Sequence, residues 1–511
     1  MSIFGPRRLP TTALAVSILV LATGSACGSG DSGTDSTAAA PLKIGTVNFP
    51  TSLDPTVSSS GYDYPHLNLV YDRLLVGDPK TGELGPGLAT SWKVADDGSS
   101  ITLELREGVK FSDGTTMDAA AVKASMDRFK ASANGQDIAS VSAITAEGAN
   151  TVVLTMSKPD SSIPTALSDR AGMIVSPAAV QKEGKDFAAR PVGTGKYTLE
   201  SLQTGAAVNY KRNDAYWGDK GKAPTLNWQV FKDPQAMVTA FQSNVVDVAI
   251  SVPPLSVEKL KTVPGKQVVV GPAYSETMIN FNAKLAPTDK VEIRQAINYA
   301  LDREVIRKAA SGDAAEVTWT ALPPTHPYHD ASITPTYAYD EAKAKALVAQ
   351  ATGGKRVAMK CLTFPGLNYE TSGPIIIDSL KKIGIDVTIQ SETAAAATEA
   401  FWAKSQAPCF LSGWTGHADP AITYGRLLNP DSFYNAGKTD FGTAQLQDKL
   451  LTTYDFAPRK AAATDLAKKV AEVAPFAPLF TVPMIVGLSD QVDGYEPNAS
   501  GRPDMSTVAR K

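Results

Sequence analysis

The sequence predicts a mixed α/β protein with more than one lobe, and three observations lead to this prediction. The first is length, since roughly 470 residues remain after a leader is removed, more than one simple core usually organises. The second is composition, which at 43% hydrophobic and 20% charged residues is typical of a globular chain. The third is an alternation of strand and helix patterns without sequence repeats.

The first half of the chain supplies separate strand and helix signals. Residues 42–47 (LKIGTV) predict a strand, and 101–105 alternate apolar and polar side chains as a half-buried strand does. Residues 116–130 place apolar side chains at helical spacing. Asp233 followed by proline predicts the capped start of a helix over 234–242.

A second capped start is expected further along the chain. Asp289 with Glu292 resembles a capping box, so we expect a helix from there to about Asp302, continuing through Ile306. The most apolar late stretch, 473–488, contains three prolines, which favours buried strands over a membrane span.

The most regular pattern lies between residues 356 and 414. It predicts strand, helix, strand, helix and strand over 356–364, 369–383, 385–390, 394–404 and 408–414, with Gly384 ending the first helix. Such a unit forms a parallel sheet with right-handed crossovers. Ligands of open α/β sheets bind beyond the carboxyl ends of the strands, and residues 413–417 (GWTGH) lie at such an end.

Cys27 stands where an apolar leader meets a polar stretch. A positive pair at residues 7–8 precedes an apolar run over 12–21 that is too short to span a bilayer. This layout is typical of a secretory signal peptide, and it resembles a bacterial lipobox, with glycine in place of the usual leucine three residues before the cysteine. We expect a signal peptide over 1–26 and a lipidated Cys27. The alternative is an ordinary signal peptide with a chance cysteine.

The stretch after Cys27 (GSGDSGTDSTAAA) lacks the apolar bulk needed to fold. We therefore expect a flexible tether over 27–41, which spans roughly 20 Å. The protein is then predicted to lie on the extracytoplasmic face of a bacterial cell membrane, held by its N-terminal lipid.

Charge and cysteine content narrow the function further. Removing the two arginines of the leader from 49 basic residues leaves 47 against 52 acidic ones, a net charge of −5 without a basic stripe, so no nucleic-acid partner is expected. Cys361 and Cys409 lie in apolar strand-like runs. In an exported protein they can form a disulfide; the alternative is two small buried hydrophobic residues.

The sequence contains no pattern typical of catalysis or metal binding. Its four histidines include no His-Glu-x-x-His signature. His326, His329 and Asp330 could hold a metal, but their proline-rich loop favours a solvated segment. We therefore expect no metal, no cofactor and no enzymatic activity; a secreted peptidase would need a nucleophile with its base or a set of metal ligands.

Several strings, in this order along nearly the whole mature chain, resemble one family, the family 5 extracellular solute-binding proteins, which include oligopeptide- and dipeptide-binding proteins of ABC importers. The strings that carry the resemblance are 53–55 (LDP), 88–92 (LATSW), 105–114 (LREGVKFSDG), 191–197 (PVGTGKY), 213–217 (NDAYW), 240–248, 281–282 (FN), 293–304 and 380–385 (LKKIGI).

The resemblance implies an α/β, two-lobed fold like that of periplasmic binding proteins, of the cluster C type, with hinge strands between the lobes. Lobe 1 would comprise 42–58, 195–276 and 482–511, with an extra subdomain, 59–194, inserted into it. Lobe 2 would comprise 277–481. Ligand would be enclosed as the lobes close, and we expect a monomer that docks on the permease subunits of an ABC importer.

The residues expected to contact ligand lie near one strand end. Trp414 is the strongest candidate, because an indole at a sheet edge can stack on a ligand. Backbone groups of the same strand and of the first loop could pair with an extended ligand as an added strand. The full set of expected ligand-binding residues is Trp414, Gly413, Ser412, Thr415, His417, Asp419, Phe49, Thr51 and Tyr274, with Glu276 as a further hinge candidate.

His417 bears on the ligand itself. The resemblance places it where peptide-binding members carry an aspartate that pairs with the peptide's α-amine, and a neutral histidine can only accept one hydrogen bond there. Asp419 could substitute, although its Asp-Pro pair is also typical of a turn. We expect a peptide or peptide-like solute, with a blocked peptide, a metal chelate or a sugar derivative as alternatives. A ligand-sensing receptor of the same fold also fits the sequence.

Overall fold

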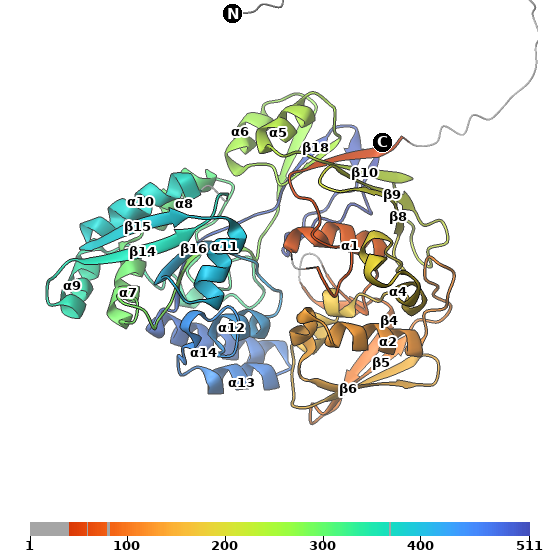
Figure 1. Cartoon of the computed structure of the whole chain (residues 1–511), viewed down its shortest axis with the longest axis horizontal. Coiled ribbons are helices and arrows are strands. Elements are labelled where there is room, and N and C mark those ends of the chain that lie inside the picture. Colours follow the sequence, from red (N-terminus) through yellow and green to blue (C-terminus); the bar gives the residue numbers. More distant parts are fainter. Residues whose placement is uncertain (1–39, 59, 79–81, 367–368) are drawn as a thin grey trace, which may run out of the picture. The chain divides into compact units, whose positions relative to one another are not determined.

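The computed structural model describes residues 40–58, 60–78, 82–366 and 369–511. The predicted signal peptide, Cys27 and all of the tether except residues 40–41 lie outside the described residues. No helix within the described part of the chain is both long and apolar enough to cross a membrane. The fold is α/β, as predicted, with three main sheets (Figure 1).

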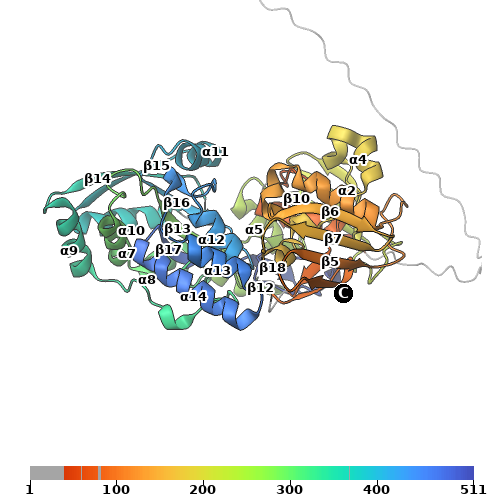
Figure 2. The same ribbon diagram turned by 90° about the horizontal axis from the view of Figure 1, so that it is seen from below.

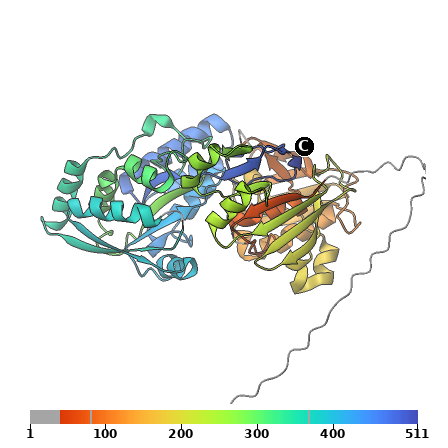
Figure 3. The same cartoon turned by 90° about the horizontal axis from the view of Figure 1, so that it is seen from above.

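A seven-stranded sheet contains segments from both ends of the chain. Its strand order is β12 (Lys266–Val270), β18 (Ile485–Ser489), β11 (Val248–Ile250), β1 (Leu42–Thr46), β10 (Thr225–Val230), β9 (Ala207–Arg212) and β8 (Tyr197–Gln203). The predicted strand near residue 42 is β1, which pairs in parallel with β10 and β11. In Figure 3 this red strand lies beside the yellow-green strands of the sheet.

The helices near this sheet are short, and side chains cap the starts of α4 and α5. They are α1 (Tyr64–Val70), α4 (Pro177–Glu183), α5 (Pro234–Gln242) and α6 (Val257–Lys261), with the terminal pair β19 (Val492–Asp493) and β20 (Ala509–Arg510) nearby in sequence to β18. The predicted cap of α5 is confirmed, because the Asp233 carboxylate accepts a hydrogen bond from Ala236 N at 2.7 Å.

A four-stranded antiparallel sheet is formed entirely by the chain between β1 and β8. Its order is β4 (Ala89–Val94), β5 (Ser100–Leu105), β7 (Thr151–Met156) and β6 (Val141–Glu147). Helix α2 (Ala119–Lys130) covers it (Figure 2), and α3 (Ile163–Ala166) and the hairpin of β2 (Leu75–Gly77) and β3 (Leu84–Pro86) complete this unit. Its buried apolar side chains form a core of their own, separate from that of the seven-stranded sheet.

The predicted strand–helix unit is confirmed in a five-stranded sheet. Its order is β15 (Ile385–Ser391), β14 (Val357–Thr363), β16 (Cys409–Trp414), β13 (Glu276–Phe281) and β17 (Phe476–Thr481). Strand β14 pairs in parallel with β15 and β16, as the unit requires, and β13 pairs antiparallel with its two neighbours.

Helices cover both faces of the five-stranded sheet. Residues that alternate along β13 enter two cores: Ile279 packs on one face and Met278 on the other. The helices that accompany this sheet are α7 (Val291–Ala300), α8 (Arg303–Ser311), α9 (Glu341–Thr352), α10 (Tyr369–Lys382), α11 (Ala394–Thr398), α12 (Pro420–Leu428), α13 (Ala444–Thr452) and α14 (Phe456–Val473). In Figure 2, α12, α13 and α14 lie together along β13, β16 and β17.

The chain passes twice between the seven-stranded and the five-stranded sheets. It leaves β12 and enters β13 across residues 271–275, and it leaves β17 and returns to β18 across residues 482–484. The two passages touch, because Val482 N donates to Ser275 O at 2.7 Å. Both passages lie at the lobe bounds that the resemblance implies, 276/277 and 481/482.

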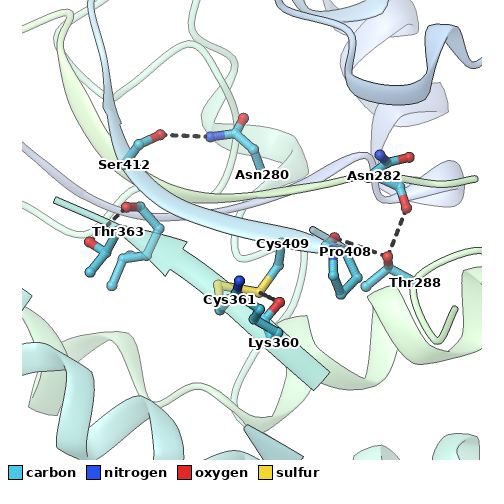
Figure 4. The surroundings of a disulfide bond; sticks show 10 residues. Asn280, Asn282, Thr288, Lys360, Cys361, Thr363, Pro408, Cys409 and Ser412 are labelled. Atoms are coloured by element: carbon cyan, nitrogen blue, oxygen red, sulfur yellow. Dashed lines mark hydrogen bonds between the residues drawn. A yellow bond between two sulfur atoms is a disulfide. The ribbon is translucent and has the colours of Figure 1, made fainter. Parts of the chain in front are cut away.

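Cys361 and Cys409, for which the sequence left a disulfide open, are joined by one. They face each other across the parallel pair β14 and β16. Figure 4 shows the bond between these two strands, with Asn280 of β13 donating to Ser412 Oγ further along β16 at 3.1 Å.

The expected continuous helix near residue 290 is wrong. Helix α7 begins after Lys290 without a side-chain cap, so Asp289 does not cap it. The chain becomes extended at Leu301, and Asp302 caps a separate helix, α8, by accepting from Val305 N. The aspartate that the sequence placed inside a helix is therefore an N-cap, because its side chain competes with continued helix.

The glycine-rich string at 191–197 is a packing turn. A Cβ atom at Gly193 would lie 2.3 Å from Val70 O, and one at Gly195 would lie 2.5 Å from Leu69 O. Both glycines are thus needed where this turn crosses the end of α1.

Candidate functional site

A cavity of about 340 Å³ lies where three parts of the chain converge. One part belongs to the segment between β1 and β8, one to the loop after β16, and one to the C-terminal segment after β18. Its lining residues include the ionisable side chains of Arg73, Asp78, Asp169, His417, Glu496, Arg502 and Asp504, together with Tyr274 and Asn498. Its volume suits a small solute, at the low end of ligand pockets.

The loop after β16 carries His417 into the cavity wall. Only glycine fits at position 416, because a Cβ atom there would lie 2.0 Å from Tyr274 O. His326 holds His417 in place through its backbone, because the Nε2 of His326 donates to His417 O at 2.9 Å. The Nδ1 of His326 accepts from Tyr328 N at 3.1 Å. The imidazole of His326 also contacts the ring of Tyr274, with centroids 4.9 Å apart.

This arrangement requires a neutral His326. Its Nδ1 must remain unprotonated to accept from the Tyr328 backbone, and burial lowers the pKa of His326 to about 4. His326 is therefore a buried structural residue, which corrects the expectation of a solvated loop. His329 Nδ1 lies 2.8 Å from Leu322 O. Among the described residues no group of three His, Cys, Asp or Glu side chains could hold a metal.

His417 itself is only half-buried, yet it lies in a crowded and charged environment. Burial of the imidazole, and then the nearby guanidinium of Arg426, lower the pKa of His417 well below its usual range. The residue is therefore neutral near pH 7 and provides no charge to a bound solute.

Arg502 and Asp169 form a charged part of the cavity wall. Arg502 Nη1 donates to Asp169 Oδ2 at 2.8 Å, and the Arg502 guanidinium lies 3.4 Å from the centre of the Tyr64 ring. Arg170 lies over the same ring at 4.3 Å. Burial opposes ionisation of Asp169, but Arg502, Tyr64 and Arg170 more than offset it and hold the pKa of Asp169 well below its usual range.

Asp419 has structural partners, which leaves its carboxylate fully engaged. It caps α12 by accepting from Ala421 N at 2.8 Å, and it forms a two-bond ion pair with Arg459 at 2.8 Å for each bond. Thr165 Oγ1 donates to it at 3.3 Å. Asp419 is only 1% exposed, so the structure gives no support to its expected role as an amine partner.

Trp414 and Glu276 are buried in the five-stranded sheet. They face each other across β16 and β13, are 6% and 0% exposed, and do not line the cavity. The Trp414 indole packs edge-on against Tyr434, and its N–H has no hydrogen-bond partner. Burial raises the pKa of Glu276 well above its usual range, although the Thr318 hydroxyl lies nearby.

The remaining expected contacts have distinct environments. Gly413 and Thr415 are exposed, whereas the Ser412 side chain is buried against Asn280. The ladder of β16 with β13 continues to Trp414, but its ladder with β14 ends at Phe410. Near the first strand, Phe49 packs on the core of the seven-stranded sheet, and Thr51 donates through N and Oγ1 to the Asp63 carboxylate at 2.7 and 2.6 Å.

Of the residues expected from sequence, the structure brings Tyr274 and His417 to the cavity. The sequence analysis missed Arg73, Asp169 and Arg502. Each stands alone in its segment, and Arg502 is 333 residues from its partner Asp169. No local spacing marks such a pair.

Comparison with known proteins gives a consistent result. A family model described as bacterial extracellular solute-binding proteins, family 5, matches residues 83–435. The chain is 28% identical over 477 residues to the glutathione-binding protein GsiB of Shigella dysenteriae serotype 1, covering 88% of this chain and 90% of that protein.

Solved structures match the fold over nearly the whole chain. The dipeptide-binding protein of Pseudoalteromonas sp. SM9913 in complex with Met-Leu has a TM-score of 0.82 at 22% identity, covering 92% of this chain and 100% of that one. NikA of Brucella suis in complex with Fe(III)-EDTA has a TM-score of 0.83 at 23% identity, with the same coverage. With the match of the family model over most of the chain, the protein belongs to the bacterial extracellular solute-binding proteins, family 5.

Proposed function

We propose that this protein is the extracytoplasmic binding component of an ABC importer and that it encloses a small peptide or peptide-like solute in the cavity beside His417. The observation that carries the proposal is the composition of the cavity wall. Segments attached to the seven-stranded sheet and the loop after β16 of the five-stranded sheet both contribute to it. A solute bound there contacts both halves at once and so favours the state in which they are together.

The lobe division expected from the resemblance fits this proposal. The two touching passages at 271–275 and 482–484 would serve as the hinge, and the edge of β16 beyond Phe410, where its ladder with β14 ends, would pair with an extended solute. Solute binding should then reduce the radius of gyration measured by small-angle X-ray scattering. A sedimentation measurement should give a monomer with and without solute.

The anchor is a separate part of the proposal and rests on the sequence alone. Lipidated Cys27 would hold the protein at the membrane through the tether, close to the permease subunits of an importer. A Cys27→Ser variant should appear in the culture medium or periplasm instead of the membrane fraction. Mass spectrometry of the mature N-terminus distinguishes a lipidated cysteine from an ordinary cleaved leader.

The binding proposal is tested by calorimetry with glutathione, which the relative GsiB is named for binding, and with L-alanyl-L-alanine, preceded by mass spectrometry of any solute that co-purifies. Gly416→Ala should lower affinity at least about tenfold, because a Cβ atom there meets Tyr274 O at 2.0 Å and displaces the loop. Gly425→Ala is the matched control, since a Cβ atom in α12 meets nothing within 4 Å. Equal affinities of the two variants would contradict a site at this loop.

A further inference from the structure

Arg426 and Asp137 form an ion pair between the two halves of the protein. Arg426 Nη2 donates to Asp137 Oδ1 at 2.5 Å, and the two side chains are 25% and 21% exposed. Arg426 lies on α12, which packs on the five-stranded sheet, whereas Asp137 follows α2 of the four-stranded unit. Neither residue lines the cavity. The pair therefore joins the halves without contacting the space for a solute.

Asp137 is anchored by its own half of the protein. It belongs to a short 3-10 helix, Ala133–Ile138. Asn134 of this helix donates through Nδ2 to Pro55 O at 3.0 Å and to Ser58 O at 2.8 Å, which ties the helix to the loop after β1. The position of the Asp137 carboxylate is thus set by contacts that do not involve α12.

Helix α12 connects Arg426 to the cavity. Ile422 lines the cavity, and Arg426 follows it by four residues, one turn further along the same face of the helix. Asp419 caps the start of the helix and pairs with Arg459. Burial, and then the nearby guanidinium of Arg426, lower the pKa of His417. A solute that contacts His417 and Ile422 therefore touches the same loop and helix that present Arg426.

The ion pair differs in kind from neighbouring contacts between the halves. The four-stranded unit also contacts the segment at 451–454 through two neutral hydrogen bonds, donated by Asp160 N and Ser161 N. A charge-assisted hydrogen bond is roughly twice as strong as a neutral one, and a partly buried pair is screened less than an exposed one. Of these contacts, the ion pair should contribute most to the state in which the halves are together.

We infer that the pair of Arg426 and Asp137 is a latch, which forms as the two halves come together and slows the release of a bound solute. The inference rests on the proposed function and adds two positioning residues outside the cavity that set its affinity. Solute enters while the halves are apart, so the latch does not act on association. It has to break before the solute leaves, so its loss should raise the dissociation rate constant alone.

The test is a double-mutant cycle on the rate of release. The mature protein, freed of co-purified solute by unfolding and refolding, is loaded with radiolabelled glutathione and, in a second series, with radiolabelled L-alanyl-L-alanine. Release into an excess of unlabelled solute gives the dissociation rate constant, and calorimetry gives Kd, so that the association rate constant follows from their ratio. Wild type is compared with Arg426→Gln, Asp137→Ala and the double variant.

We expect each single variant to release the solute about tenfold faster, with an unchanged association rate constant. The double variant should release it no faster than either single variant, because all three lose the same interaction. A residue that merely supports the fold would not produce this pattern, since its loss would not be confined to release. Should one single variant fail to fold, the release rate of the other decides.

Arg510→Gln is the matched control. Arg510 forms a two-bond ion pair with Asp247 at 2.9 and 2.8 Å, and their side chains are 33% and 8% exposed. Asp247 directly precedes β11 and Arg510 ends β20, so both belong to the part of the chain built on the seven-stranded sheet. This variant loses an ion pair of similar burial within one half, and it should release the solute at the wild-type rate.

Three results would overturn the inference while the binding proposal stands. They are release at the wild-type rate in the single variants, a double variant about a hundredfold faster than wild type, and release accelerated equally by Arg510→Gln. An affinity loss that arises from slower association would contradict it as well. Absence of binding of both probes to the wild type overturns the proposed function and this inference together.

Discussion

Two arginine–aspartate clusters lie near the loop at 416–419, and they differ in burial. Asp419 and Arg459 are 1% and 5% exposed, and every oxygen of the carboxylate is used by Arg459, Ala421 or Thr165. Asp169 and Arg502 are more exposed and border a cavity. The first cluster is a closed structural unit, whereas the second lies at the surface of the cavity.

This difference in burial helps to distinguish charged residues that hold the structure together from charged residues that can contact a ligand. A buried pair that satisfies all its hydrogen bonds holds elements together, and here it ties the start of α12 to α14. A partly exposed pair in the wall of a cavity can also contact a ligand. Proximity in sequence suggests the wrong aspartate as a ligand contact, because Asp419 lies nearer to His417 in the chain than Asp169 does.

The largest expected effect comes from breaking the closed cluster. Arg459→Met leaves the Asp419 carboxylate buried without its counter-charge, which should cost about 3–5 kcal/mol of folding free energy. Urea unfolding followed by circular dichroism measures this loss. Arg356→Met serves as the control, since the Arg356–Asp386 pair is half exposed and its loss should change stability little. Similar destabilisation by both variants would contradict the distinction between the clusters.

A pH-dependent effect is expected at His326, which holds the loop between the clusters. Its folded pKa of about 4 lies below the unfolded value of 6.5, so the unfolded state binds the proton more readily. Stability from this residue is complete above about pH 6.5 and is lost as pH falls toward 4, with a total of about 3 kcal/mol at 1.36 kcal/mol per unit.

His326→Gln should therefore reduce the difference in unfolding free energy between pH 5 and pH 7. The remaining difference comes from other buried histidines such as His66, whose pKa burial lowers to about 3. Urea denaturation at the two pH values checks the prediction. An unchanged difference would mean that His326 is protonated in the folded protein.

The smallest effect is expected at a contact between the four-stranded unit and the end of α13, close to Arg459. Asp160 N donates to the Tyr454 hydroxyl at 3.1 Å, and Ser161 N donates to Leu451 O at 2.8 Å, so the four-stranded unit contacts the end of α13. Tyr454→Phe removes one hydrogen bond, worth about 1 kcal/mol. Because this contact requires the two halves to be together, solute affinity should fall by about two- to fivefold.

Tyr339→Phe is the control for this prediction. Its hydroxyl is also exposed and donates to Glu341 within the same segment, so the variant should bind solute with wild-type affinity. Calorimetry with the same dipeptide measures both variants. If Tyr454→Phe also bound with unchanged affinity, the contact would have no part in closure.

The fold was largely predictable because its signals are local. Alternating side chains marked β5, the strand–helix unit marked the parallel part of the five-stranded sheet, and Asp233 marked the start of α5. Asp302 was missed as a cap, since an aspartate inside an apolar helical pattern has two local interpretations and tertiary packing of α7 and α8 decides between them.

The site was only partly predictable, for a physical reason. The motif around Trp414 correctly predicted the end of a strand and identified His417. Which of the residues near it are structural depends on their burial, which the motif does not show. Tyr434 packs against Trp414, and Arg459, forty residues further along the chain, forms an ion pair with Asp419. Arg502 and Asp169 are brought into contact only by tertiary folding, so no local sequence pattern could predict their ion pair.

Tyr274 belongs both to a passage between the two sheets and to the wall of the cavity. It stands on one of the two passages between the sheets, its carbonyl is pressed against Gly416, and its ring forms part of the cavity wall. A rotation of the backbone at Tyr274 would therefore change the shape of the cavity and move His417 at the same time. Under the proposed function, solute binding and hinge bending would both act through Tyr274, so a change here that tightens binding would also alter release of the solute.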